Sequence, residues 1–436
     1  MKYSFRRAFF WLGIYLVLCL IPLFIAITGP IPEKRDFWIE FGVALGFLGL
    51  AMFALQFIFS GRFEKIAATF GMDNVHHFHR KMGIIAFVFV LMHPITLILA
   101  NPEFLSYFDP RINAPRAVAL SFATVSLILI TVTSLWRLSF GLNYEKWRLV
   151  HGVLALALVF IGTVHVLQVS HYINTLWKQI LLALLMGGSM YLVIHTRIVR
   201  PWKNRKKPYK VTNVQKERDD SWTLELKAHN HKRMSFETGQ FAWLTINDSP
   251  FSMQQHPFTI ASSEMDNSLL FTAKSTGDFT ATWKDIEVGA KVFLEGPFGS
   301  FTPKENRNLF LIMGGIGVTP AMSMLRTLKD KKDKRKITLV YANENWKNIT
   351  FREELEELKT LLNLKLIHIL NKPEDGWKGE SGIVDYDLLK KHLPEQHNDY
   401  MYYICGPEPM MDEAEIALRD LGVDWRHIYT ERFDIV

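Results

Sequence analysis

The sequence predicts a membrane bundle of six α-helices, followed by a small antiparallel β-barrel and a parallel α/β domain. Long apolar runs dominate roughly the first 200 of the 436 residues. Short runs that alternate apolar and polar residues then begin at Tyr209, as in antiparallel strands. After Phe301 the pattern changes to strands that alternate with helices, which is typical of a parallel sheet. We therefore expect domains over residues 1–201, 208–304 and 305–436.

Each apolar segment is long enough to cross a bilayer, which takes about 20 residues. The six segments cover approximately residues 9–29, 38–59, 79–100, 117–136, 149–169 and 175–199. Lys and Arg cluster before the first segment, in the second and fourth connections, and after the sixth. By the positive-inside rule, both termini and the two later domains are expected in the cytoplasm of a multi-pass cell-membrane protein.

Composition excludes several kinds of site and partner. Cys19 and Cys405 are the only two cysteines, which excludes a disulfide framework, a Cys-based zinc site, an iron–sulfur cluster and covalent haem attachment. The formal charge of +7 comes from basic residues beside the apolar runs, so it indicates contact with membrane lipid and argues against nucleic acid. Nothing in the sequence indicates an oligomeric state.

Histidines recur at matched positions in the third and fifth apolar segments. His79 and His93 are fourteen residues apart, and so are His151 and His165. Fourteen helical steps return to within roughly 40° of the starting direction and rise about 21 Å, so each pair shares one helix face. Because the two segments run in the same direction, we expect His79 to face His151 and His93 to face His165.

Two imidazoles on facing helices suit the axial positions of a haem iron. Zinc would require more ligands, and no carboxylate lies at these depths for a di-iron site. The bundle is therefore predicted to hold two b-type haems. Gly83 and Gly152 either make room for the flat rings or serve ordinary helix packing. A six-span transporter that relays protons through its histidines is the alternative from another class.

Two short strings within the barrel region fit a flavin site. In "QQHPFTIASS", His256, Pro257, Phe258 and Thr259 can supply a strand-edge platform for a flavin ring. The string "KSTGDFT" then adds a cation, a glycine that permits close approach, and a hydroxyl, from Lys274, Gly277 and Thr280. Either string alone would also suit a turn between strands.

Two glycine turns in the last domain follow apolar strands. In "NLFLIMGGIGVTP", Gly314, Gly315 and Gly317 let the backbone approach a pyrophosphate at the start of a helix. The helix begins with Thr319 and Pro320, and the second turn, in "YYICGPEPMM", contains Gly406 and Pro407. Cys405 is expected to pack near a nicotinamide, and it has no adjacent partner that would make it a nucleophile.

The strand "KITLVYANENW" should end near the ribose of the nucleotide. An acidic residue there favours a free 2′-hydroxyl, whereas an arginine accommodates a 2′-phosphate. Asn343, Glu344 and Asn345 therefore favour NADH over NADPH. A solvent-facing Glu344 without a role in recognition is the alternative.

Taken in order, the four histidines, "HPFTIASS", "GDFT", "GGIGVTP" and "CGPEPM" resemble the ferric reductase and NADPH oxidase superfamily over nearly the whole chain. The resemblance implies a ferredoxin-reductase-type module, with FAD on the barrel and NAD(P)H on a Rossmann-like domain. Electrons would pass from cytoplasmic NAD(P)H through FAD and two haems to an acceptor outside.

The same resemblance implies roles for single residues. His256 to Thr259 would contact the isoalloxazine and ribityl groups, Ser262 would also contact FAD, and Lys274 and Thr280 would hold the pyrophosphate. Phe433 would cover the flavin ring, with Cys405 and Glu431 beside the reacting rings. For Phe433, packing in the core is the alternative.

The acceptor is left open between O₂, as in a superoxide-producing oxidase, and a ferric chelate, as in a ferric reductase. The chain could also relay electrons to a partner protein outside. The loop "NPEFLSYFDPRINAPR" has no metal-binding cluster, which mildly disfavours a dedicated iron site.

Overall fold

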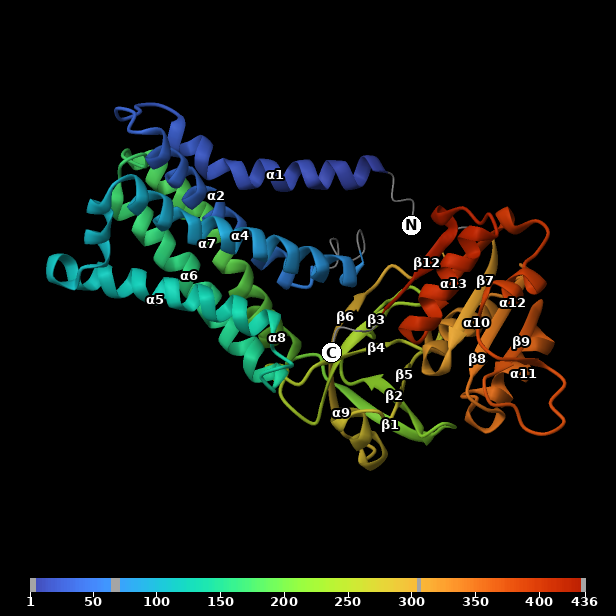
Figure 1. Cartoon of the computed structure of the whole chain (residues 1–436). Helices are drawn as coiled ribbons and strands as arrows, with labels where there is room; N and C mark the ends of the chain where they lie inside the picture. The colour runs from blue at the N-terminus through green and yellow to red at the C-terminus, as the bar shows by residue number, and fades with distance from the viewer. Residues whose placement is uncertain (1–4, 64–70, 304–306, 433–436) are drawn as a thin grey trace. The chain divides into compact units, whose positions relative to one another are not determined.

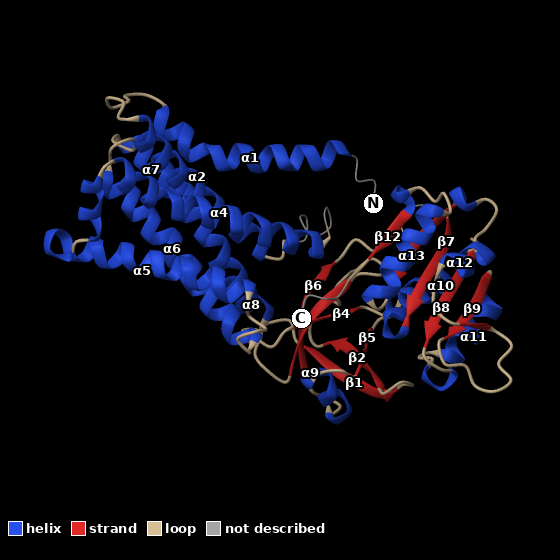
Figure 2. Ribbon diagram, in the orientation of Figure 1, coloured by secondary structure: helices blue, strands red, loops and turns tan. Residues whose placement is uncertain are grey.

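The computed structural model describes residues 5–63, 71–303 and 307–432. It divides into two compact units, which are described separately. One comprises Ser4–Phe63 and Asn74–Arg200, and the main part of the other is Pro201–Val436. All regular structure in the first unit is helical, whereas the second combines two sheets with helices (Figure 2).

Six helices in the described ranges are long and apolar enough to cross a membrane. They are α1 (Phe5–Ile27), α2 (Phe37–Ser60), α4 (Met72–Ala100), α5 (Pro110–Leu135), α6 (Tyr144–Val169) and α7 (Leu176–Ile194) (Figure 1). A 3₁₀ helix, η1 (Pro102–Phe108), joins α4 to α5, while the π-helical η2 (His195–Val199) and α8 (Arg200–Asn204) continue α7.

Several of these helices begin before the predicted apolar segments, because polar residues cap them. The Asp109 carboxylate accepts a hydrogen bond from the backbone N–H of Arg111, and Pro110 occupies the first turn of α5. Asn143 caps α6 in the same way through the N–H of Lys146. Hydropathy therefore located the spans, whereas capping chemistry decided where the helices start.

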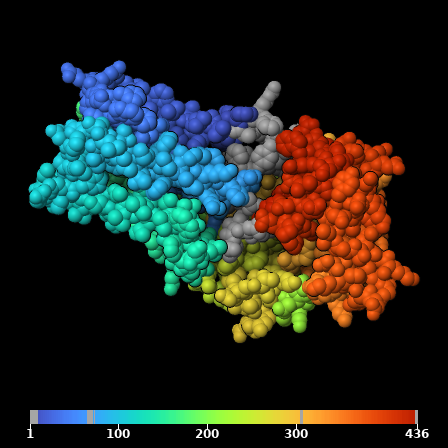
Figure 3. Space-filling view, viewed as in Figure 1, coloured from blue at the N-terminus to red at the C-terminus, as the bar shows by residue number. Residues whose placement is uncertain are grey.

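A line of glycines on α2 brings α4 into close contact. Cβ atoms built on Gly42, Gly46 and Gly49 would lie 3.1, 2.7 and 2.5 Å from side-chain atoms of α4. Small residues allow helix backbones to approach in this way within membranes. On its other side α4 packs against α5, and the two helices lie side by side on the face seen in Figure 3.

The first sheet of the second unit is antiparallel and curled. Its strands are β1 (Tyr209–Lys216), β2 (Ser221–Ala228), β3 (Phe241–Ile246), β4 (His256–Thr259), β5 (Leu269–Lys274) and β6 (Lys291–Phe298). They lie in the order β4-β3-β6-β1-β2-β5, and a bridge between Ile260 and Phe271 joins the two edges. The fully buried Trp283, in η3 (Thr282–Asp285), helps to fill the interior.

The second sheet is parallel, with the order β10-β9-β8-β7-β11-β12. Its strands are β7 (Asn308–Gly314), β8 (Ile337–Asn343), β9 (Leu364–Leu370), β10 (Glu380–Ser381), β11 (Tyr400–Cys405) and β12 (Ile428–Thr430). Alternate residues of β7 enter the two cores on opposite faces. The main covering helices are α10 (Thr319–Asp330) and α11 (Arg352–Leu361) on one face, and α12 (Tyr386–His392) and α13 (Glu408–Asp420) on the other.

A buried histidine lies on β9 of this sheet. The His368 side chain is 8% exposed and packs against the rings of Trp346 and Tyr341. In the described part of the chain, neither of its ring nitrogens has a hydrogen-bond partner. Burial lowers the pKa of His368 to about 4, although the Glu356 carboxylate partly opposes this effect.

This histidine should make stability depend on pH. Because the pKa of His368 is lower in the folded state, the unfolded chain binds more protons between about pH 4 and 6.5. The contribution is complete above pH 6.5 and is lost as the pH falls toward 4, on the order of 3 kcal/mol in total. Denaturant unfolding of the full chain at several pH values should show this loss of unfolding free energy. In His368→Leu, the free energy of unfolding should depend less on pH over the same range. If the free energy of unfolding depends on pH equally in the two proteins, the prediction is contradicted.

Candidate functional site

The four predicted histidines meet in two pairs between α4 and α6. The ring centroids of His79 and His151 are 6.4 Å apart, at an interplanar angle of 55°. Those of His93 and His165 are also 6.4 Å apart, at 69°. Because the earlier histidine of α4 pairs with the earlier one of α6, and the later with the later, the two helices run in the same direction.

This separation fits a metal ion between the two rings. A metal–nitrogen distance of about 2 Å on each side, with a ring radius of about 1 Å, puts the centroids roughly 6 Å apart. Nδ1 of His93 lies 2.8 Å from the Gly42 carbonyl oxygen; as the N–H donor it leaves Nε2 as the ligating atom. Nδ1 of His151 lies 3.3 Å from Oγ of Ser134. The residues present therefore suit two axially ligated haems.

Gly46 determines how closely His93 approaches α2. A Cβ atom at this position would lie 2.7 Å from Nδ1 of His93, closer than side chains tolerate. The absence of a side chain therefore lets the imidazole reach the Gly42 carbonyl. Gly46 and Gly42 are site residues that the sequence analysis missed, because their role appears only when α2 and α4 are placed together.

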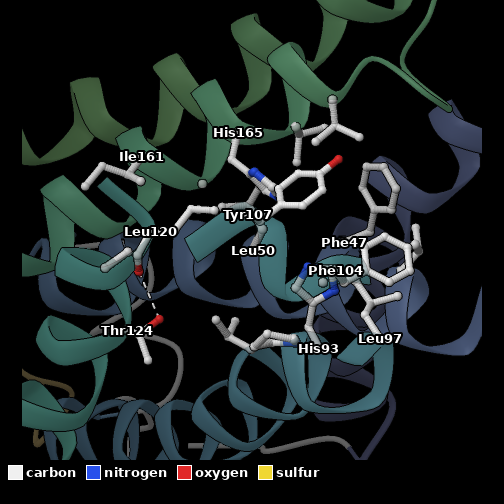
Figure 4. Close-up of a pocket in the computed structure, with 18 of the residues that line it drawn as sticks. Phe47, Leu50, His93, Leu97, Phe104, Tyr107, Leu120, Thr124, Ile161 and His165 are labelled. Carbon is white, nitrogen blue, oxygen red and sulfur yellow. Dashed lines mark hydrogen bonds between the residues drawn. The ribbon is translucent and has the colours of Figure 1, made fainter. Parts of the chain in front are cut away.

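The His93–His165 pair borders a largely apolar cavity (Figure 4). Its apolar lining includes Phe47, Leu50, Leu97, Phe104, Leu120 and Ile161. The rings of Tyr107 and His165 are nearly perpendicular with centroids 6.0 Å apart, and the Arg116 guanidinium lies 4.2 Å from the centre of the Tyr107 ring. The Arg116 guanidinium therefore lies near the part of the cavity that His165 borders.

A polar group from the connecting segments lines another part of the same cavity: Arg35, His171 and Tyr172. The Glu40 carboxylate orders this group, since it accepts hydrogen bonds from the Tyr172 hydroxyl and from the backbone and side chain of Arg35. In the described ranges, Nε2 of His171 is buried without a hydrogen-bond partner. The cavity thus combines an apolar interior with a cation and an available imidazole nitrogen.

Lys178 anchors the segment that carries this polar group. Its side chain is fully buried, and Nζ donates hydrogen bonds to the carbonyl oxygens of Ala26, Pro30 and Tyr172 at 3.0 to 3.2 Å. The Ala26 carbonyl is in the last turn of α1, whereas those of Pro30 and Tyr172 belong to the connections after α1 and after α6. Because three acceptors satisfy the ammonium, the buried charge stabilises both connections.

The His79–His151 level is more aromatic and less completely hydrogen-bonded. The Trp147 ring lies 5.1 Å from His151. Within the described residues, Nδ1 of His79 and both polar side-chain atoms of Gln56 are buried without hydrogen-bond partners. Cβ atoms at Gly83 and Gly152 would meet nothing within 4 Å, so space remains on these helix faces.

The predicted flavin residues lie along one edge of the curled sheet. His256, Pro257, Phe258 and Thr259 form β4, which pairs with β3. Phe279 lies 4.2 Å from the His256 ring and stacks nearly parallel to Phe258. Phe279 was not among the sequence candidates, although it lies inside the "GDFT" string that contains two of them.

In the second flavin string, Lys274 and Thr280 have hydrogen-bond or ion-pair partners within the protein. Nζ of Lys274 is 2.5 Å from the Asp219 carboxylate, so its expected role at a pyrophosphate requires that this ion pair be shared or exchanged. Oγ1 of Thr280 accepts hydrogen bonds from the N–H groups of Thr276 and Gly277 at the start of α9 (Asp278–Ala281). A Cβ at Gly277 would meet nothing within 4 Å, which leaves room for a ligand.

The two glycine turns of the parallel sheet touch each other, since they end adjacent strands. A Cβ at Gly317 would lie 2.7 Å from the Cys405 carbonyl oxygen, and one at Gly406 would lie 2.9 Å from the Gly314 nitrogen. Gly315 has φ +52°, a conformation that side chains disfavour. Thr319 and Pro320 begin α10 directly after the first turn, and Pro407 precedes α13.

The middle of α10 bonds to the segment that follows β4 of the curled sheet. Oγ of Ser323 donates to the Ser262 carbonyl oxygen at 2.9 Å, and Nη1 of Arg326 donates to the Ala261 carbonyl oxygen at 2.7 Å. The Arg326 guanidinium also forms a bidentate ion pair with Glu354. The segment Ala261–Ser262, which follows the strand where a flavin is expected, is therefore fixed to α10.

The remaining predicted residues lie near the end of the chain. Cys405 is buried at the end of β11. Glu431 follows β12, and its carboxylate faces Gly299 beside the Phe241 ring. Phe433 lies outside the described residues.

Three families match successive parts of the chain. Residues 45–162 match the family described as ferric reductase like transmembrane component. Residues 202–302 match the FAD-binding domain, and residues 311–415 match the oxidoreductase NAD-binding domain.

Curated relatives named NADH-cytochrome b5 reductase 1 match part of the chain. NADH-cytochrome b5 reductase 1 of Aspergillus terreus is 32% identical over 163 residues, which are 35% of this chain and 55% of the relative. The enzyme of the same name from Mycosarcoma maydis is 27% identical over 266 residues, which are 58% of this chain and 82% of the relative. The chain therefore spans little more than half the length of the Aspergillus relative.

Two solved structures, a ferredoxin reductase and an FAD/NAD-binding domain by name, each cover about half of this chain. The ferredoxin reductase in carbazole 1,9a-dioxygenase is 24% identical, with a TM-score of 0.46, and covers 52% of this chain and 69% of its own. The FAD/NAD-binding domain of nitric oxide dioxygenase from Vibrio cholerae is 22% identical, with a TM-score of 0.47. The match covers 52% of this chain and 97% of that domain.

The order of the three matched families, on six apolar helices and two sheets, defines a class of membrane flavoprotein oxidoreductase. The chain has the architecture of the ferric reductase and NADPH oxidase superfamily. It is a multi-pass membrane protein with domains for FAD and a nicotinamide nucleotide.

The role of Gly46 can be tested without altering a histidine. Gly46→Ala places a methyl group against the His93 ring and should displace it from the Gly42 carbonyl. We expect the purified variant to lose about half of the bound haem, measured from the reduced-minus-oxidised spectrum, because one of two axial sites is disturbed. Gly187→Ala on α7, where a Cβ meets nothing within 4 Å, is the control and should retain the full haem signal. Full haem content in Gly46→Ala would contradict the assignment.

Proposed function

We propose that the protein is a transmembrane oxidoreductase that moves electrons from NAD(P)H, through FAD and two b-type haems, to an acceptor on the opposite side of the cell membrane. The observation that carries the proposal is the pair of histidine contacts with equal 6.4 Å separations on two parallel helices. The FAD-binding and NAD-binding families that match the second unit support a two-electron donor site on the same chain.

In this proposal the second unit binds and orients the two redox partners. The touching glycine turns leave the backbone open for a pyrophosphate, and β4 with Phe279 provides an aromatic platform for a flavin. When bound, FAD accepts a hydride and releases single electrons, which b-type haems can carry. The bonds from Ser323 and Arg326 to the residues after β4 keep the platform in register with the nucleotide turn.

The membrane residues orient the axial ligands and exclude ions. The Gly42 carbonyl and Ser134 hold the Nδ1 atoms of His93 and His151, which favours ligation through Nε2. The apolar lining between the helices keeps water and ions out of the path. By the positive-inside rule, the His79–His151 pair lies on the cytoplasmic side, and the His93–His165 cavity faces outward.

The cavity beside His93 and His165 has room for a small electron acceptor that approaches these two histidines. Its apolar interior suits O₂, whereas Arg35 with His171 suits an anionic ferric chelate. Both acceptors remain in the proposal, because each matches a different part of the same lining. A transporter that relays protons has no need for paired rings at metal-ligand spacing.

The haem assignment is tested by spectroscopy on the purified full chain. A dithionite-reduced minus oxidised spectrum should show b-type bands, and His93→Ala should remove about half of them and stop transfer to the acceptor. Reduction of FAD by NAD(P)H should survive. His77→Ala, on the same helix but exposed, is the matched control and should retain both haems. Absence of b-type bands, or an unchanged spectrum in His93→Ala, would refute the haem assignment.

The acceptor is tested by comparing O₂ with an anionic ferric chelate. Removing the cation with Arg35→Gln should lower kcat/KM for the chelate by roughly tenfold, because a charge-assisted contact is lost. The rate of O₂ reduction that a superoxide scavenger suppresses should change little in Arg35→Gln. Lys34→Gln, an adjacent exposed cation, is the control. If Arg35→Gln and Lys34→Gln behave alike, the cavity cation does not recognise the chelate.

A further inference from the structure

The end of β8 lies at the edge of the parallel sheet where a nucleotide is expected. In a parallel sheet all strands end at the same edge, so the residues after β8 and β9 lie on the same side as the glycine turns after β7 and β11. A dinucleotide whose pyrophosphate rests on Gly315 extends its ribose toward the end of β8. The residues that follow β8 therefore face the 2′ position of that ribose.

The chains leaving β8 and β9 stay paired beyond the strands. The N–H of Asn371 donates to the Asn343 carbonyl oxygen at 3.0 Å, and the N–H of Lys372 donates to the Glu344 carbonyl oxygen at 2.6 Å. This pairing brings the two side chains together, with Nζ of Lys372 2.6 Å from Oε1 of Glu344. The acidic residue that the sequence offered to the ribose therefore has a cation beside it.

Both side chains of this pair remain accessible to a ligand. The Glu344 side chain is 53% exposed and that of Lys372 is 73% exposed. The hydrogen bond and charge of Lys372 lower the pKa of Glu344, and the charge of Lys274 contributes further. Lys274 belongs to the "KSTGDFT" string of the curled sheet, so a second cation acts on the same carboxylate.

We infer that Glu344 and Lys372 together form the 2′ subsite, and that the protein consequently oxidises both NADH and NADPH. The Glu344 carboxylate accepts a hydrogen bond from a free 2′-hydroxyl, as acidic residues at this position do. The Lys372 ammonium offers a point charge to a 2′-phosphate. An exposed ion pair contributes little to stability, so either partner can turn to the ligand at small cost. This inference rests on the proposed function, since it concerns the donor of the same electrons.

The two partners should have opposite effects on nucleotide choice. We measure kcat/KM for NADH and NADPH with the FAD-loaded full chain and ferricyanide as the electron acceptor. Lys372→Ala should lower kcat/KM for NADPH by roughly tenfold and leave NADH within about twofold, because only the phosphate loses a charged contact. Glu344→Gln should raise NADPH use relative to NADH, because the carboxylate no longer repels the phosphate.

A nearby ion pair on the same edge provides the matched control. Lys347 lies 3.8 Å from Glu374 and is 82% exposed, so Lys347→Ala removes a similar charge without altering the Glu344–Lys372 pair. It should leave the NADPH to NADH ratio unchanged. Added salt should raise the KM for NADPH more than that for NADH in the wild type, but not in Lys372→Ala.

The outcomes separate this inference from the proposed function. If the wild type oxidises a nucleotide but Lys372→Ala and Glu344→Gln leave the ratio unchanged, or Lys347→Ala changes it equally, the inference is wrong and the proposed function stands. If the wild type oxidises neither nucleotide, the proposed function fails and the inference fails with it.

Discussion

The close approach of α4 to α2 is the constraint on which the membrane site depends. Gly42, Gly46 and Gly49 remove the side chains that would hold the two helices apart. The imidazole of His93 can then reach a backbone carbonyl that α2 would otherwise bury without a second partner. A ring fixed through Nδ1 presents Nε2 in one direction, toward α6, where His165 lies at the corresponding depth. Helix packing thus determines ligand orientation.

A comparable constraint operates in the nucleotide-binding sheet. β7 and β11 are neighbours, so the turns that follow them compete for the same space. Glycine at positions 314, 317 and 406 allows the two turns to pack together, because a side chain at Gly314, Gly317 or Gly406 would collide with the other turn. The glycines that leave the backbone open for a phosphate are therefore also those that let the two turns pack. The lack of side chains meets a structural and a binding requirement together.

The flavin platform and the nucleotide turn are linked by polar contacts from α10. Ser323 and Arg326 donate to the carbonyl oxygens of Ser262 and Ala261, shortly after β4, and Arg326 is in turn held by Glu354 of α11. A platform attached only by apolar contacts could slide, whereas directional hydrogen bonds fix its register. The same helix that begins at the glycine turn thus supports both proposed binding sites.

Much of the membrane site could be predicted from the amino-acid sequence alone. Helix geometry selected His79, His93, His151 and His165, since a fourteen-residue spacing determines both the face and the depth of each imidazole. The parts that could not be predicted depend on contacts between distant segments. Gly46, Ser134 and Phe279 carry no signal of their own, and Lys274 has an ion-pair partner, Asp219, that only the folded barrel brings near it.

The sequence by itself determined the six spans, the paired histidines and the order of the three domains, because hydrophobic length, helical period and glycine turns are local properties of a chain. The tertiary structure decided which carbonyl orients His93, that Arg35 lines the cavity, and that Lys372 lies beside Glu344. These features arise where residues far apart in sequence come within hydrogen-bond distance. No local pattern encodes such a distance, since it depends on how helices and strands pack.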